Sequence, residues 1–105
     1  MKKYLIEFEK MSWERVALGV KHKIYTMGNQ KIRLVEFSDD FIEDNWCTRE
    51  HIGYVLEGKM LVNFSGNFVS FKSGDGMFIQ KGEANKHLAK IPKGEKALLI
   101  LFEKI

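Results

Sequence analysis

The chain of 105 residues is long enough for one domain and carries 45% apolar residues along its whole length, which excludes extensive disorder. Its net charge of +3 comes from scattered lysines with no concentrated basic stripe, so we expect no nucleic-acid partner. Cys47 is the only cysteine, which excludes an internal disulfide, and no apolar stretch approaches a membrane span; we therefore expect a cytoplasmic protein without membrane contact.

The first half of the chain predicts strands separated by turns. Residues 20–25 alternate between apolar and polar and end at Met-Gly-Asn-Gln, which is typical of a hairpin. A second strand is expected at residues 31–37, followed by an acidic turn and a loop that runs to Trp46. We take residues 1–30 as N-terminal strands and residues 31–102 as the main barrel of one domain.

The second half predicts further short strands. Gly58 separates two of them, and Ser-Gly-Asn and Pro-Lys-Gly mark turns; the expected strands are residues 54–56, 59–64, 68–72, 77–79, 86–91 and 97–102. Eight or nine short strands with turns every 8–12 residues indicate an all-β sandwich or barrel. The run 97–102 is apolar on both faces, which predicts a fully covered strand, either central in a sheet or at a dimer interface.

Two glycine-containing stretches carry a family resemblance. Residues 51–58 read His-Ile-Gly-Tyr-Val-Leu-Glu-Gly, and residues 74–82 read Gly-Asp-Gly-Met-Phe-Ile-Gln-Lys-Gly. They resemble the two signature motifs of the cupin family: His-x-His, three or four residues, Glu, six residues, Gly; then Gly, five residues, Pro-x-Gly, two residues, His. The resemblance implies an all-β fold, a cupin-like antiparallel jelly-roll β-barrel, in which Gly58 and Gly82 adopt positive φ.

The resemblance also implies where metal ligands would lie. A usual cupin presents three His and one Glu to iron, manganese, zinc or nickel, and the matching positions here hold Asn45, Cys47, His51 and Asn85. Only Cys47 and His51 are good donors. His87 lies two residues beyond Asn85, and residues i and i+2 of a strand share a face. Cys47, His51 and His87 therefore form a candidate site for a divalent metal, zinc or iron, with water in the open position.

Other side chains near the motifs are candidates for a ligand pocket. The resemblance places Asn45 and Asn85 beside the barrel interior, and Trp46 is expected at the barrel mouth. If Asn85 occupies the usual histidine position, Asn85→His should strengthen metal binding. Arg49 is expected on a solvated face.

Each candidate also has a structural interpretation. His51 is either a ligand or a buried histidine bonded to the backbone or Glu50, and Cys47 is either a small buried apolar residue or a thiolate partnered by His51. His87 is either a ligand or a half-exposed strand residue. His22, between two lysines, is expected on the surface.

Three functions remain open from the sequence. The chain is a binding module for a small molecule with or without a metal, a metal-dependent isomerase, epimerase or dioxygenase, or a regulatory interaction protein. A barrel this small leaves sheet edges and apolar strand faces that need covering, so we expect a homodimer.

Overall fold

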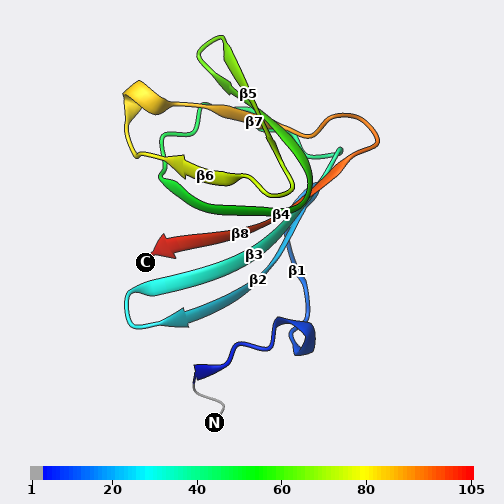
Figure 1. Ribbon diagram of the computed structural model, residues 1–105, viewed down its shortest axis with the longest axis vertical. Helices are drawn as coiled ribbons and strands as arrows, with labels where there is room; N and C mark the ends of the chain where they lie inside the picture. Colours follow the sequence, from blue (N-terminus) through cyan, green and yellow to red (C-terminus); the bar gives the residue numbers. More distant parts are fainter. Residues whose placement is uncertain (1–3) are drawn as a thin grey trace.

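The structure is a computed structural model that describes residues 4–105, and it is a curled antiparallel β-sheet that forms a jelly-roll barrel (Figure 1). This confirms the all-β prediction. Two short 3-10 helices, η2 (Phe8–Lys10) and η3 (Glu83–Asn85), accompany eight strands: β1 (Glu14–Ala17), β2 (Val20–Met27), β3 (Gln30–Ser38), β4 (His51–Phe64), β5 (Asn67–Lys72), β6 (Gly76–Ile79), β7 (Leu88–Lys90) and β8 (Lys96–Lys104). Within this part of the chain, no helix is long and apolar enough to cross a membrane.

The long strand β4 joins the two halves of the barrel. Its first half pairs with β8 and β6, and its second half pairs with β5 and β7. The sequence predicted a break at Gly58, but the strand continues through it with a register irregularity between Val55 and Glu57. Gly58 has φ +84°, and an added Cβ would overlap the carbonyl oxygen of Lys96, so only glycine fits this bend.

The other half of the sheet runs in the order β1-β2-β3-β8-β4, so β8 is a central strand, as its apolar sequence predicted. It is not covered on both faces, however. Ala97, Leu99 and Leu101 are buried against the core, whereas Phe102 on the outer face is 49% exposed. The outer face of β8 is therefore apolar and partly open to solvent.

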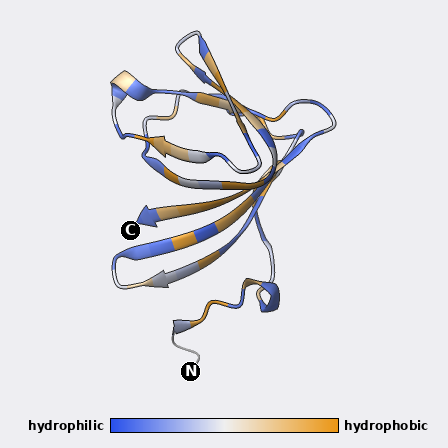
Figure 2. Ribbon diagram, viewed as in Figure 1, coloured by the Kyte–Doolittle hydropathy of each residue, from blue (hydrophilic) through white to orange (hydrophobic). Residues whose placement is uncertain are grey.

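The inner face changes from apolar to charged along its length. Val35 and Leu99 are fully buried in the core, while Lys31 and Arg33 of β3 and Glu103 of β8 share the same inward register toward one end. Figure 2 shows this end in blue, where the C-terminal end of β8 adjoins the start of β3. The barrel thus has an apolar interior and a charged mouth.

Candidate functional site

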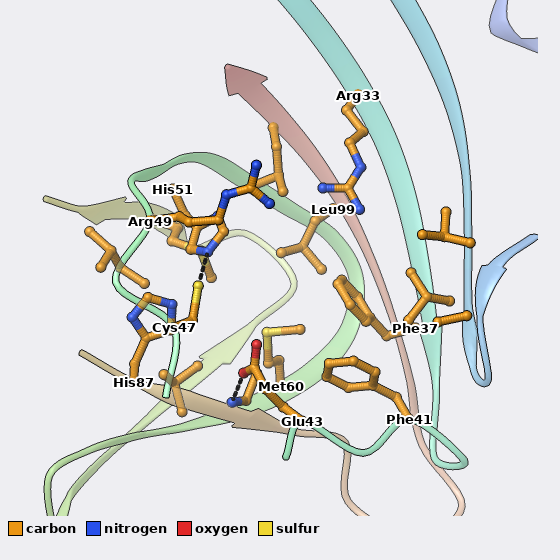
Figure 3. A pocket seen from close by; sticks show the side chains of 18 residues that line it. Arg33, Phe37, Phe41, Glu43, Cys47, Arg49, His51, Met60, His87 and Leu99 are labelled. Atoms are coloured by element: carbon orange, nitrogen blue, oxygen red, sulfur yellow. Dashed lines mark hydrogen bonds between the residues drawn. The ribbon is translucent and has the colours of Figure 1, made fainter. Parts of the chain in front are cut away.

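A cavity of about 250 Å³ lies inside the barrel. Phe37, Phe41, Met60 and Leu99 are among the apolar side chains that form much of its wall. Polar side chains converge on it from three directions, as Figure 3 shows; they are Arg33, Glu43, Cys47, Arg49, His51 and His87. Such a combination of an apolar wall and a few convergent polar groups is typical of small-molecule sites.

Cys47, His51 and His87 meet at one end of the cavity (Figure 3). Each offers a ligand atom, and the three atoms lie within 4.8 Å of one another. Cys47 comes from the loop after β3, His51 opens β4, and His87 precedes β7. The backbones of Cys47 and His87 bind each other through two hydrogen bonds of 2.8 and 3.0 Å, which holds the loop beside the strand.

The hydrogen bonds of His87 determine which nitrogen faces the cluster. Its Nδ1 lies 3.0 Å from the carbonyl oxygen of Asn85, and because a carbonyl only accepts, Nδ1 carries the proton and donates. In the neutral ring Nε2 is then an unprotonated acceptor. It is buried and has no hydrogen-bond partner among residues 4–105. A backbone carbonyl that orients one nitrogen while the other stays free is the usual arrangement of a metal-binding histidine.

Burial keeps His51 neutral. Loss of hydration, followed by the nearby His87, lowers the pKa of His51 from 6.5 to about 4; Glu103 opposes this shift, and the guanidinium groups of Arg33 and Arg49 add to it. Its Nδ1 is buried without a partner among the described residues, and its Nε2 lies 3.6 Å from Sγ of Cys47. A neutral imidazole is the state of histidine that metal binding requires, and Cys47 would lose its thiol proton on binding.

The three residues fit a divalent metal. Zinc bonds of about 2.3 Å to sulfur and about 2.0–2.1 Å to nitrogen, at a tetrahedral angle, separate the two donors by roughly 3.6 Å. The observed Sγ to Nε2 separation is 3.6 Å. Buried polar nitrogens are normally hydrogen-bonded, so the orphaned Nε2 of His87, a residue of the same cluster, points to a ligand.

The structure does not bring Asn45, Trp46 and Asn85 into the cavity lining. Trp46 is 42% exposed and its ring lies 5.3 Å from Nζ of Lys86. Asn85 ends the 3-10 helix η3, and it is its backbone carbonyl that contacts His87. These residues lie within two positions of Cys47 or His87 in the sequence but are not part of the cavity lining.

The surface assignment of His22 was wrong. Its side chain is buried on the inner face of β2, where Nδ1 accepts a hydrogen bond of 3.0 Å from Nε of Arg33. Since arginine only donates, Nδ1 is unprotonated, and in the neutral ring Nε2 donates to Glu14 at 2.9 Å. The flanking lysines occupy the outer face of the same strand, as strand alternation requires.

Two charged side chains of the cavity, Arg33 and Glu43, did not emerge from the sequence. Arg33 carried a detectable signal, because it alternates with Val35 and Phe37 and must share their inward face. Glu43 carried none: it lies in an irregular loop and is fixed by a 2.6 Å hydrogen bond that its Oε1 accepts from the backbone of Ala89. Arg49 is exposed, as expected, but it also lines the cavity.

Comparison with known proteins supports the fold. No protein-family model and no curated protein matches the chain. Among solved structures, the polyketide cyclase RemF from Streptomyces resistomycificus superposes with a TM-score of 0.80 at 18% identity, covering 95% of this chain and 78% of that one.

Two further solved structures agree. KdgF from Halomonas sp. gives a TM-score of 0.70 at 22% identity, with 90% and 86% of the two chains covered. An RmlC-like cupin from Shewanella frigidimarina gives 0.71 at 19% identity, with 94% and 89% covered. The chain therefore has the fold of a small cupin, as its two glycine motifs indicated.

Proposed function

We propose that this chain is a small-molecule-binding cupin that holds a divalent metal at Cys47, His51 and His87. The observation that carries the proposal is the buried, unpartnered Nε2 of His87, in a cluster where one ligand atom each of Cys47, His51 and His87 lie within 4.8 Å of one another. A bound metal would give Nε2 of His87 the partner that burial otherwise denies it.

The donor set favours zinc over harder metals. A thiolate and two imidazoles are soft and borderline ligands, and three protein ligands leave a fourth tetrahedral position for water or a small molecule. Iron is the second candidate, because imidazole also suits iron. The adjoining apolar cavity of about 250 Å³ provides space for an organic ligand next to that position.

The test is the metal content of protein purified without a histidine tag, measured by elemental analysis before and after incubation with zinc or iron. We expect close to one equivalent of metal in the intact protein. His51→Ala should lose it, because a central ligand is removed. Cys47→Ser should weaken zinc binding more than manganese binding, because the thiolate is the soft donor.

His22→Gln is the matched control, because it removes a histidine that is buried on the inner face outside the cluster. This variant should keep its metal. Less than about a tenth of an equivalent in the intact protein after incubation, at about pH 7.5 where imidazoles are mostly neutral, would refute the metal site.

A metal-dependent enzyme is the second candidate function. Glu43 favours it, since this carboxylate lines the same cavity as the metal cluster and only its Oε1 is engaged by the backbone. A fixed carboxylate beside a metal site is placed to act as an acid or base on a bound molecule. RemF, which shares the fold, is a polyketide cyclase.

A further inference from the structure

The charged mouth of the barrel opens onto the cavity that contains Cys47, His51 and His87. Arg33, Arg49 and His51 line both the cavity of about 250 Å³ and an adjoining outer hollow of about 430 Å³. The hollow is lined by five cationic side chains and two carboxylates besides His51: Lys31, Arg33, Arg49, Lys81, Lys104, Glu50 and Glu103. The positive charges outnumber the negative ones, so the hollow attracts anionic small molecules that enter by this route.

Arg33 is held in place by partners on both sides. Its Nε donates to His22, whose other nitrogen donates to Glu14, and its Nη1 lies 3.3 Å from Oε2 of Glu103. Glu103 also receives Lys31 at 3.1 Å, so this carboxylate is shared between two cations. The Arg33 side chain is only 19% exposed, and an arginine fixed in this way presents its remaining N–H groups in a defined direction.

Arg49 has no such partners. It makes no hydrogen bond or ion pair with any of residues 4–105, although Glu50 is its neighbour in the chain. Figure 3 shows its guanidinium group, like that of Arg33, directed toward the space above Leu99 and beside His51. Both arginines help lower the pKa of His51, so both charges act on the same volume. A guanidinium without a carboxylate partner at a cavity entrance is available to a ligand.

We infer that the ligand of this cavity is a small monocarboxylate with an apolar body, and that Arg33 and Arg49 bind its carboxylate at the mouth. The carboxylate matches the planar, two-pronged donor geometry of guanidinium groups. Of the two arginines that line the cavity, Arg33 is paired with Glu103 and Arg49 is not, which matches a single negative charge better than a phosphate dianion. Glu43 lines the cavity but not the outer hollow, so its negative charge keeps the carboxylate at the mouth and the apolar body points inward.

The cavity volume limits the body of the ligand. At about 250 Å³ it falls just below the roughly 300–1,000 Å³ of pockets that hold drug-sized molecules. Phe37 and Phe41, whose ring centroids are 4.9 Å apart, form an aromatic part of the wall. An aromatic ring on a short chain is thus a suitable probe. This inference rests on the proposed small-molecule function and adds the chemical class of the ligand.

The experiment uses the full chain, freed of metal by a chelator so that the carboxylate cannot bind a metal ion instead. 3-Phenylpropanoate and 3-phenylpropanamide have the same shape and differ in charge, and their affinities are measured by titration with amide chemical shifts as the readout. We expect the carboxylate to bind at least about tenfold more tightly, the scale of a charge-assisted hydrogen bond. Arg49→Gln should remove most of this advantage and leave the affinity of the amide unchanged.

Lys93→Gln is the matched control, since it removes one positive charge from an exposed turn outside the mouth. It should leave both affinities unchanged. Equal affinities for the two compounds, or carboxylate binding unaffected by Arg49→Gln, would overturn the inference and leave small-molecule binding standing. Absence of binding by both compounds would overturn the inference together with the small-molecule part of the proposed function, whereas the metal part is judged separately by elemental analysis.

Discussion

The buried His51 makes the stability of the metal-free protein depend on pH. Its pKa is 6.5 in an unfolded chain and about 4 in the folded protein, so between these values the unfolded chain binds the proton more tightly. Acid therefore favours unfolding. The contribution of His51 to stability is complete above pH 6.5 and is lost as the pH falls toward 4. Because a pKa difference of one corresponds to about 1.36 kcal/mol, lowering the pH from about 8 to about 5 removes about 2 kcal/mol.

The measurement is urea unfolding followed by circular dichroism, with a chelator present, for the natural sequence and for His51→Gln. Other groups titrate in both proteins, so the difference between their two pH dependences isolates His51. We expect the natural sequence to lose about 2 kcal/mol more than the variant between about pH 8 and about pH 5. Equal losses in the two proteins would refute the conclusion that His51 is buried and neutral.

Two further predictions concern the fold and its outer face. Gly58→Ala should lower the free energy of unfolding by at least about 3 kcal/mol, because φ +84° strains alanine and its Cβ would overlap the carbonyl of Lys96. Gly28→Ala is the control, since φ +61° is also positive but the space is open, and it should cost about 1 kcal/mol. Urea unfolding measures both values. For the homodimer that we propose through the apolar outer face of β8, light scattering should give twice the 12.2 kDa monomer mass. Phe102→Lys should then give monomers, whereas the control Phe68→Lys, on β5, should remain dimeric. A monomer mass for the natural sequence would exclude the dimer.

The fold was predictable where the alternation of residues is regular. Residues 20–25 alternate and residues 31–37 follow a hairpin turn, and both became paired strands, β2 and β3. The edge strand β1 could not be found this way, because all four of its residues are exposed and so carry no inward-outward pattern. The continuity of β4 was hidden for a different reason. A glycine with positive φ usually signals a turn, but here pairing with β8 and β5 carries the strand through the bend.

The candidate site was predictable in part because its donors lie near the two glycine motifs. Cys47, His51 and His87 were selected from motif spacing, and the structure brings them within 4.8 Å. The position of Arg33 in the site depends on how β2 and β3 pair, which a motif within one segment does not show. Arg33 reaches the cavity from β3, and its orientation comes from His22 on β2, a pairing of strands that no short motif records.

Position 85, three residues after Gly82, distinguishes two descriptions of the proposed metal site. The family motif predicts that Asn85→His strengthens metal binding, whereas the structure predicts no gain. The reason is the 3-10 helix η3, which ends at Asn85 and leaves its side chain outside the cavity lining, so that the inward position moves to His87. His87→Asn should lower zinc affinity by at least about tenfold, a loss that even outer-shell changes reach. Zinc titrations against a competing chelator, on both single variants and on the double variant, decide between the two descriptions. If Asn85→His restored the zinc affinity of His87→Asn, residue 85 would be the ligand position and the structural description would be wrong.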